Sequence, residues 1–380
     1  MQESKMVNDF FNEKEHEGEL EHIFGEYLSA KEEDRVTSLN FNEEEYEYLL
    51  DRLVEEGKEE EVLELAEHAF SKYPYSVSLL ARFCDTLILM DYPDKALEIL
   101  NLYVDSFSTE SNIYILYARA NIVKKRFAYA RDYFYKAMEL SREGEDIAES
   151  VSALGQDCID AGNYREAIYY LDRASRIGAL PYEFNNDYAF CYDKLDEPEK
   201  ALEFYDKYLD ANPFNDTVWF NVGTVRARLR DFDKAIEAFE YSVALNAENS
   251  SSLYNLAVVY MNLQRYREAA ETFEQFVTID SDVLGRLGLG EAYIRLERFD
   301  DALSQFEMLL SSGEKGGEAQ CGIDTVKAIL YCRNGEYEVF KELFLKILET
   351  GTAWLAVVYD MLPFLQGEGW FLKFIESIKK

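Results

Sequence analysis

Histidine and cysteine, the residues that most often bind metals or act as nucleophiles, are scarce in this chain. The three histidines are His16, His22 and His68. Zinc needs three or four nitrogen or sulfur ligands that converge on one point. His16 and His22 lie six residues apart, a spacing that does not place two side chains on one helix face, and no cysteine lies near them. We therefore expect no metal site.

The five cysteines form an odd and widely separated set: Cys84, Cys158, Cys191, Cys321 and Cys332. This pattern fits reduced thiols in a cytoplasm better than a disulfide framework. Three of them, Cys84, Cys158 and Cys191, fall at packing positions of expected helices. We expect these three thiols in the core, where cysteine behaves as a small apolar residue.

One segment has the glycine spacing of a phosphate-binding loop, Gly285-Arg-Leu-Gly288-Leu-Gly290. No strand precedes it and no Lys-Ser or Lys-Thr pair follows it, so we expect a helix with Gly290 at a packing position. Carboxylate pairs carry no information in a chain with 74 acidic residues, and no serine, histidine and aspartate set is localised. The sequence predicts neither a cofactor nor an enzyme activity.

The overall charge excludes several classes of partner. The 380 residues include 39 basic and 74 acidic ones, for a formal net charge of −35. Nucleic-acid binding requires a basic face, and so does docking on an anionic membrane. No apolar run approaches the roughly 18 residues that span a bilayer, and no secretory signal is visible. The acidic field favours protein partners with basic surface.

An internal period runs through most of the chain. An aromatic residue or proline, two mostly polar residues and an alanine recur at steps of 33 to 37 residues, with a bulky residue four positions after the alanine. The anchor alanines are Ala96, Ala130, Ala167, Ala201, Ala235, Ala269 and Ala302. Related segments around Val62 and Phe340 bring the series to nine units. Such a period is the signature of a repeat architecture.

Each unit has the pattern of two helices joined by a turn. Apolar residues of the first half recur at helical spacing, as at Leu253 and Leu256. Between the halves lie residues that tolerate the positive φ closing a helix, such as Gly57, Gly162 and Gly335. A small residue late in the first helix lets the backbones approach closely, and the bulky residue fills the space toward the next pair. These small residues are Gly155, Ala189, Gly223, Ala257 and Gly290.

These residue types at these offsets resemble the tetratricopeptide repeat, a helix–turn–helix unit of 34 residues. The resemblance implies an all-α fold, a right-handed α-α superhelix (a solenoid of hairpins) over residues 43–350, with repeats starting near residues 43, 77, 111, 148, 182, 216, 250, 283 and 321. Residues 1–42, which are acidic, and residues 351–380 carry apolar stripes at helical spacing. We predict that both segments are helical caps, because the ends of a repeat array must be covered.

In such a superhelix the first helices line a concave wall that binds other chains. The residues predicted to face this groove and bind a peptide are Phe220, Asn221, Thr224, Arg228, Tyr254, Asn255, Val258, Asn262, Glu291 and Arg295. The resemblance implies that Asn221 and Asn255 pair with the backbone of an extended peptide. Arg228 and Arg295 could hold a carboxylate. Alternatively, the two asparagines cap or bridge neighbouring hairpins.

The sequence thus predicts a non-catalytic cytoplasmic scaffold that binds a peptide segment or a surface of a partner protein, and no nucleic acid or membrane. Two alternatives stay open. A self-assembling homo-oligomer would associate through apolar ends such as those around Trp354 and Trp370. A regulatory subunit of an enzyme complex, or a catalytic solenoid, would carry a cleft with clustered, perturbed ionisable groups.

Overall fold

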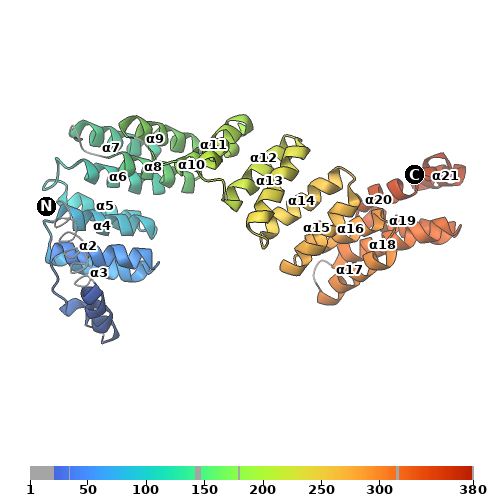
Figure 1. Cartoon of the computed structure of the whole chain (residues 1–380), viewed down its shortest axis with the longest axis horizontal. Helices are drawn as coiled ribbons and strands as arrows, with labels where there is room; N and C mark the ends of the chain where they lie inside the picture. Colours follow the sequence, from blue (N-terminus) through green and yellow to red (C-terminus); the bar gives the residue numbers. More distant parts are fainter. Residues whose placement is uncertain (1–20, 34, 142–146, 179, 314–315, 379–380) are drawn as a thin grey trace, which may run out of the picture. The chain divides into compact units, whose positions relative to one another are not determined.

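A computed structural model of the chain describes residues 21–33, 35–141, 147–178, 180–313 and 316–378 (Figure 1). All regular structure within these ranges is helical, and they contain no strand. Residues 1–20, which include His16 and the start of the predicted N-terminal cap, and residues 379–380 of the predicted C-terminal cap lie outside the described residues. Among the described residues, no helix is both long enough and apolar enough to cross a bilayer.

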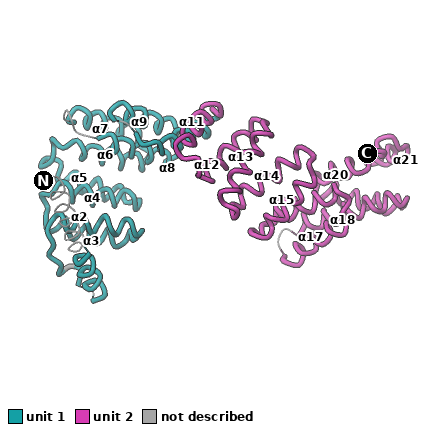
Figure 2. Tube along the Cα trace, viewed as in Figure 1, with its two compact units in different colours: residues 1–196 teal, residues 197–380 magenta. Residues whose placement is uncertain are grey.

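The chain divides into two compact units, residues 1–196 (unit 1) and residues 197–380 (unit 2), coloured separately in Figure 2. After a helical segment over residues 21–32, the helices of unit 1 are η1 (Val36–Ser38), α2 (Glu43–Glu55), α3 (Glu59–Lys72), α4 (Val77–Leu89), α5 (Pro93–Tyr103), α6 (Ser111–Val123), α7 (Phe127–Leu140), α8 (Ala148–Asp160), α9 (Tyr164–Ile177) and α10 (Phe184–Lys194). The helices of unit 2 are α11 (Pro198–Ala211), α12 (Asp216–Arg228), α13 (Phe232–Leu245), α14 (Ser250–Asn262), α15 (Tyr266–Ile279), α16 (Val283–Arg295), α17 (Phe299–Ser312), α18 (Gly316–Arg333), α19 (Tyr337–Thr350), α20 (Ala353–Met361), η2 (Pro363–Gly367) and α21 (Gly369–Ile378).

Within each unit the helices pack as consecutive antiparallel pairs. In unit 1, α2 packs on α3, α4 on α5, α6 on α7 and α8 on α9; in unit 2 the pairs run from α12 with α13 to α18 with α19. The second helix of one pair also contacts the first helix of the next, as α15 does with α16. This arrangement confirms the predicted all-α solenoid of helical hairpins.

The bulky residue after each anchor alanine fills the space that the small residue of the first helix leaves open. A Cβ built on Gly223 would lie 2.6 Å from the ring of Phe239, and one built on Gly290 would lie 2.4 Å from the ring of Phe306. A Cβ on Gly322, in the next hairpin, would lie 2.7 Å from the same Phe306 ring. The ring therefore packs toward the following hairpin, as the sequence predicted, and also within its own hairpin.

The turn between the two predicted helices of each repeat contains one residue with a positive φ. Gly57, Gly162 and Gly335 do so, with φ of 68°, 76° and 82°, as the sequence predicted. Six further turns use residues that carry a side chain: Asp91, Lys125, Asp196, Arg230, Gln264 and Glu297. An L-residue in this region brings its Cβ too close to the following carbonyl oxygen. These six turns are therefore strained.

This strain leads to a first prediction, at Lys125 in the turn between α6 and α7, where φ is 56°. We expect Lys125→Gly to raise the free energy of unfolding by about 0.5–1 kcal/mol, because glycine removes the Cβ clash but adds some chain entropy. Urea denaturation followed by circular dichroism measures the change. Gly162→Ala, at the equivalent turn of the next repeat, is the matched control and should be destabilising. A Lys125→Gly variant less stable than the wild type would contradict the prediction.

Candidate functional site

An open cavity of about 500 Å³ lies on the first-helix side of unit 2, bordered by α14, α15, α16 and α20. We call it the C-terminal groove. First helices supply most of its wall because residues three or four apart on a helix share one face. Its lining residues are Tyr254, Val258, Met261, Asn262, Gln264, Tyr266, Phe273, Leu284, Leu287, Gly288, Glu291, Arg295, Trp354 and Asp360.

The structure brings half of the predicted site residues together in this cavity. Those that line it are Tyr254, Val258, Asn262, Glu291 and Arg295. The remaining predicted residues do not line it; four lie on α12 and the last on α14: Phe220, Asn221, Thr224, Arg228 and Asn255. The groove thus centres on the seventh and eighth predicted repeats.

Several polar side chains of this region bond to their own helix. The Asn255 amide nitrogen donates to the carbonyl oxygen of Ser251 at 2.8 Å, and the Asn262 amide nitrogen donates to that of Val258 at 3.0 Å. One N–H of each amide is used in this way. An amide has two donors and an acceptor oxygen, so each asparagine retains capacity to pair with a peptide backbone.

Arg295 binds carboxylates of its own chain. Its Nη1 donates to Asp360 Oδ2 at 2.6 Å and its Nη2 to Glu291 Oε1 at 3.3 Å. The side chain is 10% exposed, and its guanidinium carbon lies 5.6 Å from the ring centroid of Tyr266. Burial lowers the pKa of Arg295, but the hydrogen bond to Asp360 and the charge of Glu291 outweigh it, so the pKa is raised. The sequence predicted that Arg295 could hold a carboxylate of a partner; in the structure it holds Asp360.

Asp360 comes from α20, which the sequence predicted only as part of a C-terminal cap. This helix contacts α18 and reaches back to α16. Its Trp354 packs edge-on against Phe306, with ring centroids 5.5 Å apart. Trp354 and Asp360 both line the C-terminal groove. Helix α20 therefore forms one wall of the groove, a role with no local signal in the sequence because its partners lie so far away along the chain.

A second cavity, of about 640 Å³, lies on the first-helix side of unit 1 between α4, α6 and α8. We call it the N-terminal groove. Its apolar lining residues are Val77, Ala81, Ile115, Leu116 and Ala153, and its polar ones are Ser78, Arg82, Asp85, Asn112, Arg119, Glu149 and Ser150.

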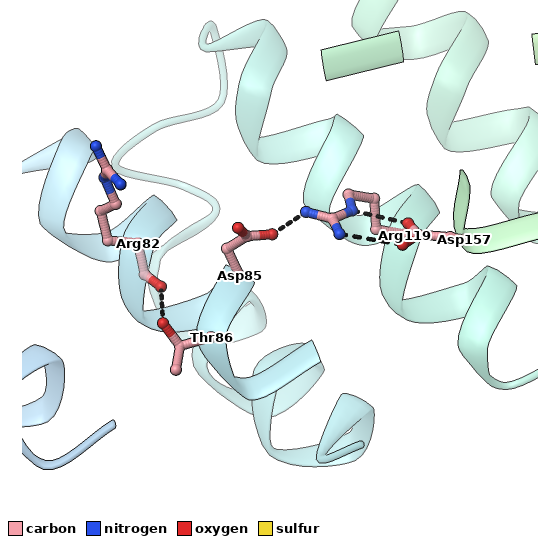
Figure 3. Close-up of polar contacts among 5 residues, drawn as sticks. All are labelled: Arg82, Asp85, Thr86, Arg119 and Asp157. Carbon is pink, nitrogen blue, oxygen red and sulfur yellow. Dashed lines mark hydrogen bonds and ion pairs between the residues drawn. The ribbon is translucent and has the colours of Figure 1, made fainter. Parts of the chain in front are cut away.

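Ion pairs connect the first helices along this groove (Figure 3). Arg119 on α6 donates to both oxygens of Asp157 on α8, at 2.7 and 3.0 Å, and pairs on its other side with Asp85 on α4. Arg82 pairs in turn with Asp51 on α2. Arg119 and Asp157 are 11% and 8% exposed. These charges therefore hold the groove wall together.

These ion pairs were not predicted, although the sequence carries a signal for one of them. Asp85 and Arg119 lie 34 residues apart and so occupy the same position in successive repeats. Asp51 holds that position one repeat earlier. An aspartate and an arginine at the same position of successive repeats, as at Asp85 and Arg119, would have pointed to a contact between neighbouring first helices.

All five cysteines are buried, which yields a second prediction. Burial raises the pKa of Cys84 to about 12 and that of Cys332 to about 11, so these thiols stay protonated at neutral pH. Because the thiolate is the reactive form, we expect no reaction with Ellman's reagent in the native protein and full reaction in urea. Fast labelling of any cysteine before unfolding would contradict this expectation.

A third prediction concerns Asp187 on α10. Burial, and secondarily the charge of Asp160, raise its pKa to about 6. A carboxyl whose pKa rises on folding stabilises the folded state when protonated, and that contribution is lost as the pH rises through the folded pKa. We expect Asp187→Asn to gain about 1 kcal/mol over the wild type at pH 7.5, after allowing for solvent screening, and little at about pH 4. Urea denaturation at the two pH values measures the difference, and an equal effect at both would contradict it.

The described residues contain no group of three or more histidine, cysteine, aspartate or glutamate side chains placed to hold a metal ion. The C-terminal groove offers aromatic area, amides and an ion pair, and the N-terminal groove offers aliphatic area, one amide and ion pairs. Such features suit recognition of another chain.

One protein-family model, described as tetratricopeptide repeat, matches residues 152–216, 223–283 and 259–319. No curated protein matches the sequence. Among solved structures, MamA from Desulfovibrio magneticus RS-1 is 20% identical, with 44% of this chain and 96% of that chain covered and a TM-score of 0.41. YrrB, described as having an unusual peptide-binding site, is 19% identical over 49% of this chain and 94% of that one, with a TM-score of 0.41. The C-terminal part of a repeat protein from Cytophaga hutchinsonii is 16% identical over 64% and 99%, with a TM-score of 0.49.

Proposed function

Because the chain is a tetratricopeptide repeat protein, we propose that it is a non-catalytic interaction scaffold that binds a peptide segment of a partner protein in the C-terminal groove. One observation carries the proposal: five residues predicted from the repeat period to bind a peptide converge on a cavity of about 500 Å³. Binding sites are typically concave and mostly apolar, with a few polar groups that fix orientation.

The lining of the groove suits an extended segment. Tyr254, Val258 and Leu287 offer apolar area to side chains of the bound segment. Asn262 and Gln264 lie at the edge of the same cavity and are exposed. Their amides can pair with backbone N–H and C=O groups of any sequence. The groove would thus take affinity from side chains and orientation from the backbone.

A selection of displayed random peptides on the full chain tests this function. We expect bound peptides, and we expect Val258→Glu to weaken their binding at least about tenfold, because it places a charge in the apolar part of the groove. Val54→Glu is the matched control: Val54 is 57% exposed on α2, outside both grooves, and should have no effect. Peptides that bind Val258→Glu as tightly as the wild type would refute the groove assignment.

The predicted pair of asparagines is tested separately. Combining Asn221→Ala with Asn255→Ala should weaken the selected peptides if these amides pair with the bound backbone. Unchanged affinity would restrict the site to the residues that line the cavity and would leave Asn221 and Asn255 a structural role.

A further inference from the structure

We propose that the C-terminal groove holds a lysine or arginine side chain of the bound segment, and that helix α20 completes this subsite. The inference rests on the proposed function, since it names the chemistry of the segment that the groove receives. Charge, aromatic lining and the position of α20 support it in turn.

The ionised side chains that line the C-terminal groove have a net charge of −1, which one further positive charge would neutralise. Glu291 and Asp360 carry two negative charges against the single positive charge of Arg295. Arg295 donates hydrogen bonds to one oxygen of each carboxylate, Oε1 of Glu291 and Oδ2 of Asp360. A carboxylate has two oxygens and about four acceptor sites. The two side chains are 34% and 61% exposed, so both can accept from a second cation.

The aromatic residues around these carboxylates suit a cation as well. Tyr254 comes from α14, Tyr266 from α15 and Trp354 from α20, and all three line the same cavity. A cation over an aromatic face is attracted by the ring quadrupole. The Arg295 guanidinium already lies over Tyr266 in this way. The apolar stem of an incoming lysine or arginine could pack along Val258 or Leu287 while its charged end reaches the carboxylates.

Helix α20 makes the net charge of the C-terminal groove negative. It contributes Trp354 and Asp360, and it is fixed by the contact of Trp354 with Phe306 and by the pair of Asp360 with Arg295. Without Asp360 the remaining ionised pair, Glu291 and Arg295, has no net charge. With Asp360 from α20, the groove therefore has a net negative charge that favours a cation.

The same peptide selection on the full chain tests the inference. We expect a lysine or arginine at one fixed position of the enriched peptides, and at least a tenfold loss of affinity when that residue is changed to glutamine. Asp360→Asn should bind the basic and the glutamine peptides alike. Glu291→Gln, on a different helix, should reduce the preference in the same direction, so that the test does not depend on one variant. Asp300→Asn removes the same charge from an exposed position of α17 outside the groove and should leave the preference intact.

The outcomes separate the two proposals. If peptides bind and are lost in Val258→Glu but show no basic preference, or if both charge variants keep that preference, the subsite is wrong while the binding groove stands. If no peptide is enriched, or if Val258→Glu binds as the wild type does, the groove function fails and the subsite fails with it.

Discussion

Phe306→Ala is expected to lower the free energy of unfolding by about 3–5 kcal/mol, the usual range for removing a fully buried aromatic side chain. The ring is 0% exposed and lies against Gly290 and Gly322, two residues without side chains that could move into the space. Its edge-on contact with Trp354 on α20 would also be lost. The variant should therefore weaken the packing of two neighbouring hairpins, α16 with α17 and α18 with α19, and of helix α20.

Tryptophan fluorescence in urea is the appropriate measurement, because the chain has three tryptophans and all of them, Trp219, Trp354 and Trp370, belong to unit 2. Phe214→Ala is the matched control, since Phe214 lies in the same unit and is 81% exposed. It should change the unfolding free energy by less than about 0.5 kcal/mol. A loss for Phe306→Ala no larger than that of the control would contradict the proposed packing.

The second large effect is expected at Arg119. Arg119→Met should lower the free energy of unfolding by about 3–5 kcal/mol, because it leaves the buried carboxylate of Asp157 without its partner. Asp157 is 8% exposed and accepts two hydrogen bonds from Arg119. Circular dichroism in urea follows the loss, and tryptophan fluorescence, which reports unit 2, should change little.

Arg82→Met supplies the control on the same face of the groove. Arg82 and Asp51 are 42% and 51% exposed, and an exposed ion pair contributes about 0–1 kcal/mol. Combining Arg119→Met with Asp157→Leu removes both charges and should recover most of the stability. Equal losses for Arg119→Met and Arg82→Met would show that burial of the pair does not matter.

Much of the fold was predictable because it repeats. The period, the anchor alanines and the small residues are local features, and Gly290 with Phe306 shows how two of them determine the contact between helices. The turn glycines Gly57 and Gly162 were found because glycine marks positive φ. The positive φ of Lys125 was not predicted, because lysine has no preference for positive φ. Only the position of Lys125 within the repeat indicates it.

The site was predictable to a smaller extent. Counting within repeats led to Tyr254, Val258 and Glu291, since their place on the wall follows from helix geometry alone. The contribution of α20 could not be found in this way. Arg295 and Asp360 lie 65 residues apart and belong to different kinds of segment, so their contact depends on how the array ends, which no single repeat encodes.

The six strained turns also have a consequence for engineering. Five of them, at Asp91, Lys125, Asp196, Arg230 and Glu297, line neither groove, so glycine could replace all five without altering a binding surface. Small gains add for sites that share no contact, whereas Asp91 and Lys125 border one cavity of about 280 Å³. We expect the variant with these five glycines to have a higher melting temperature than the wild type, although Glu297→Gly also removes the ion pair with Arg333.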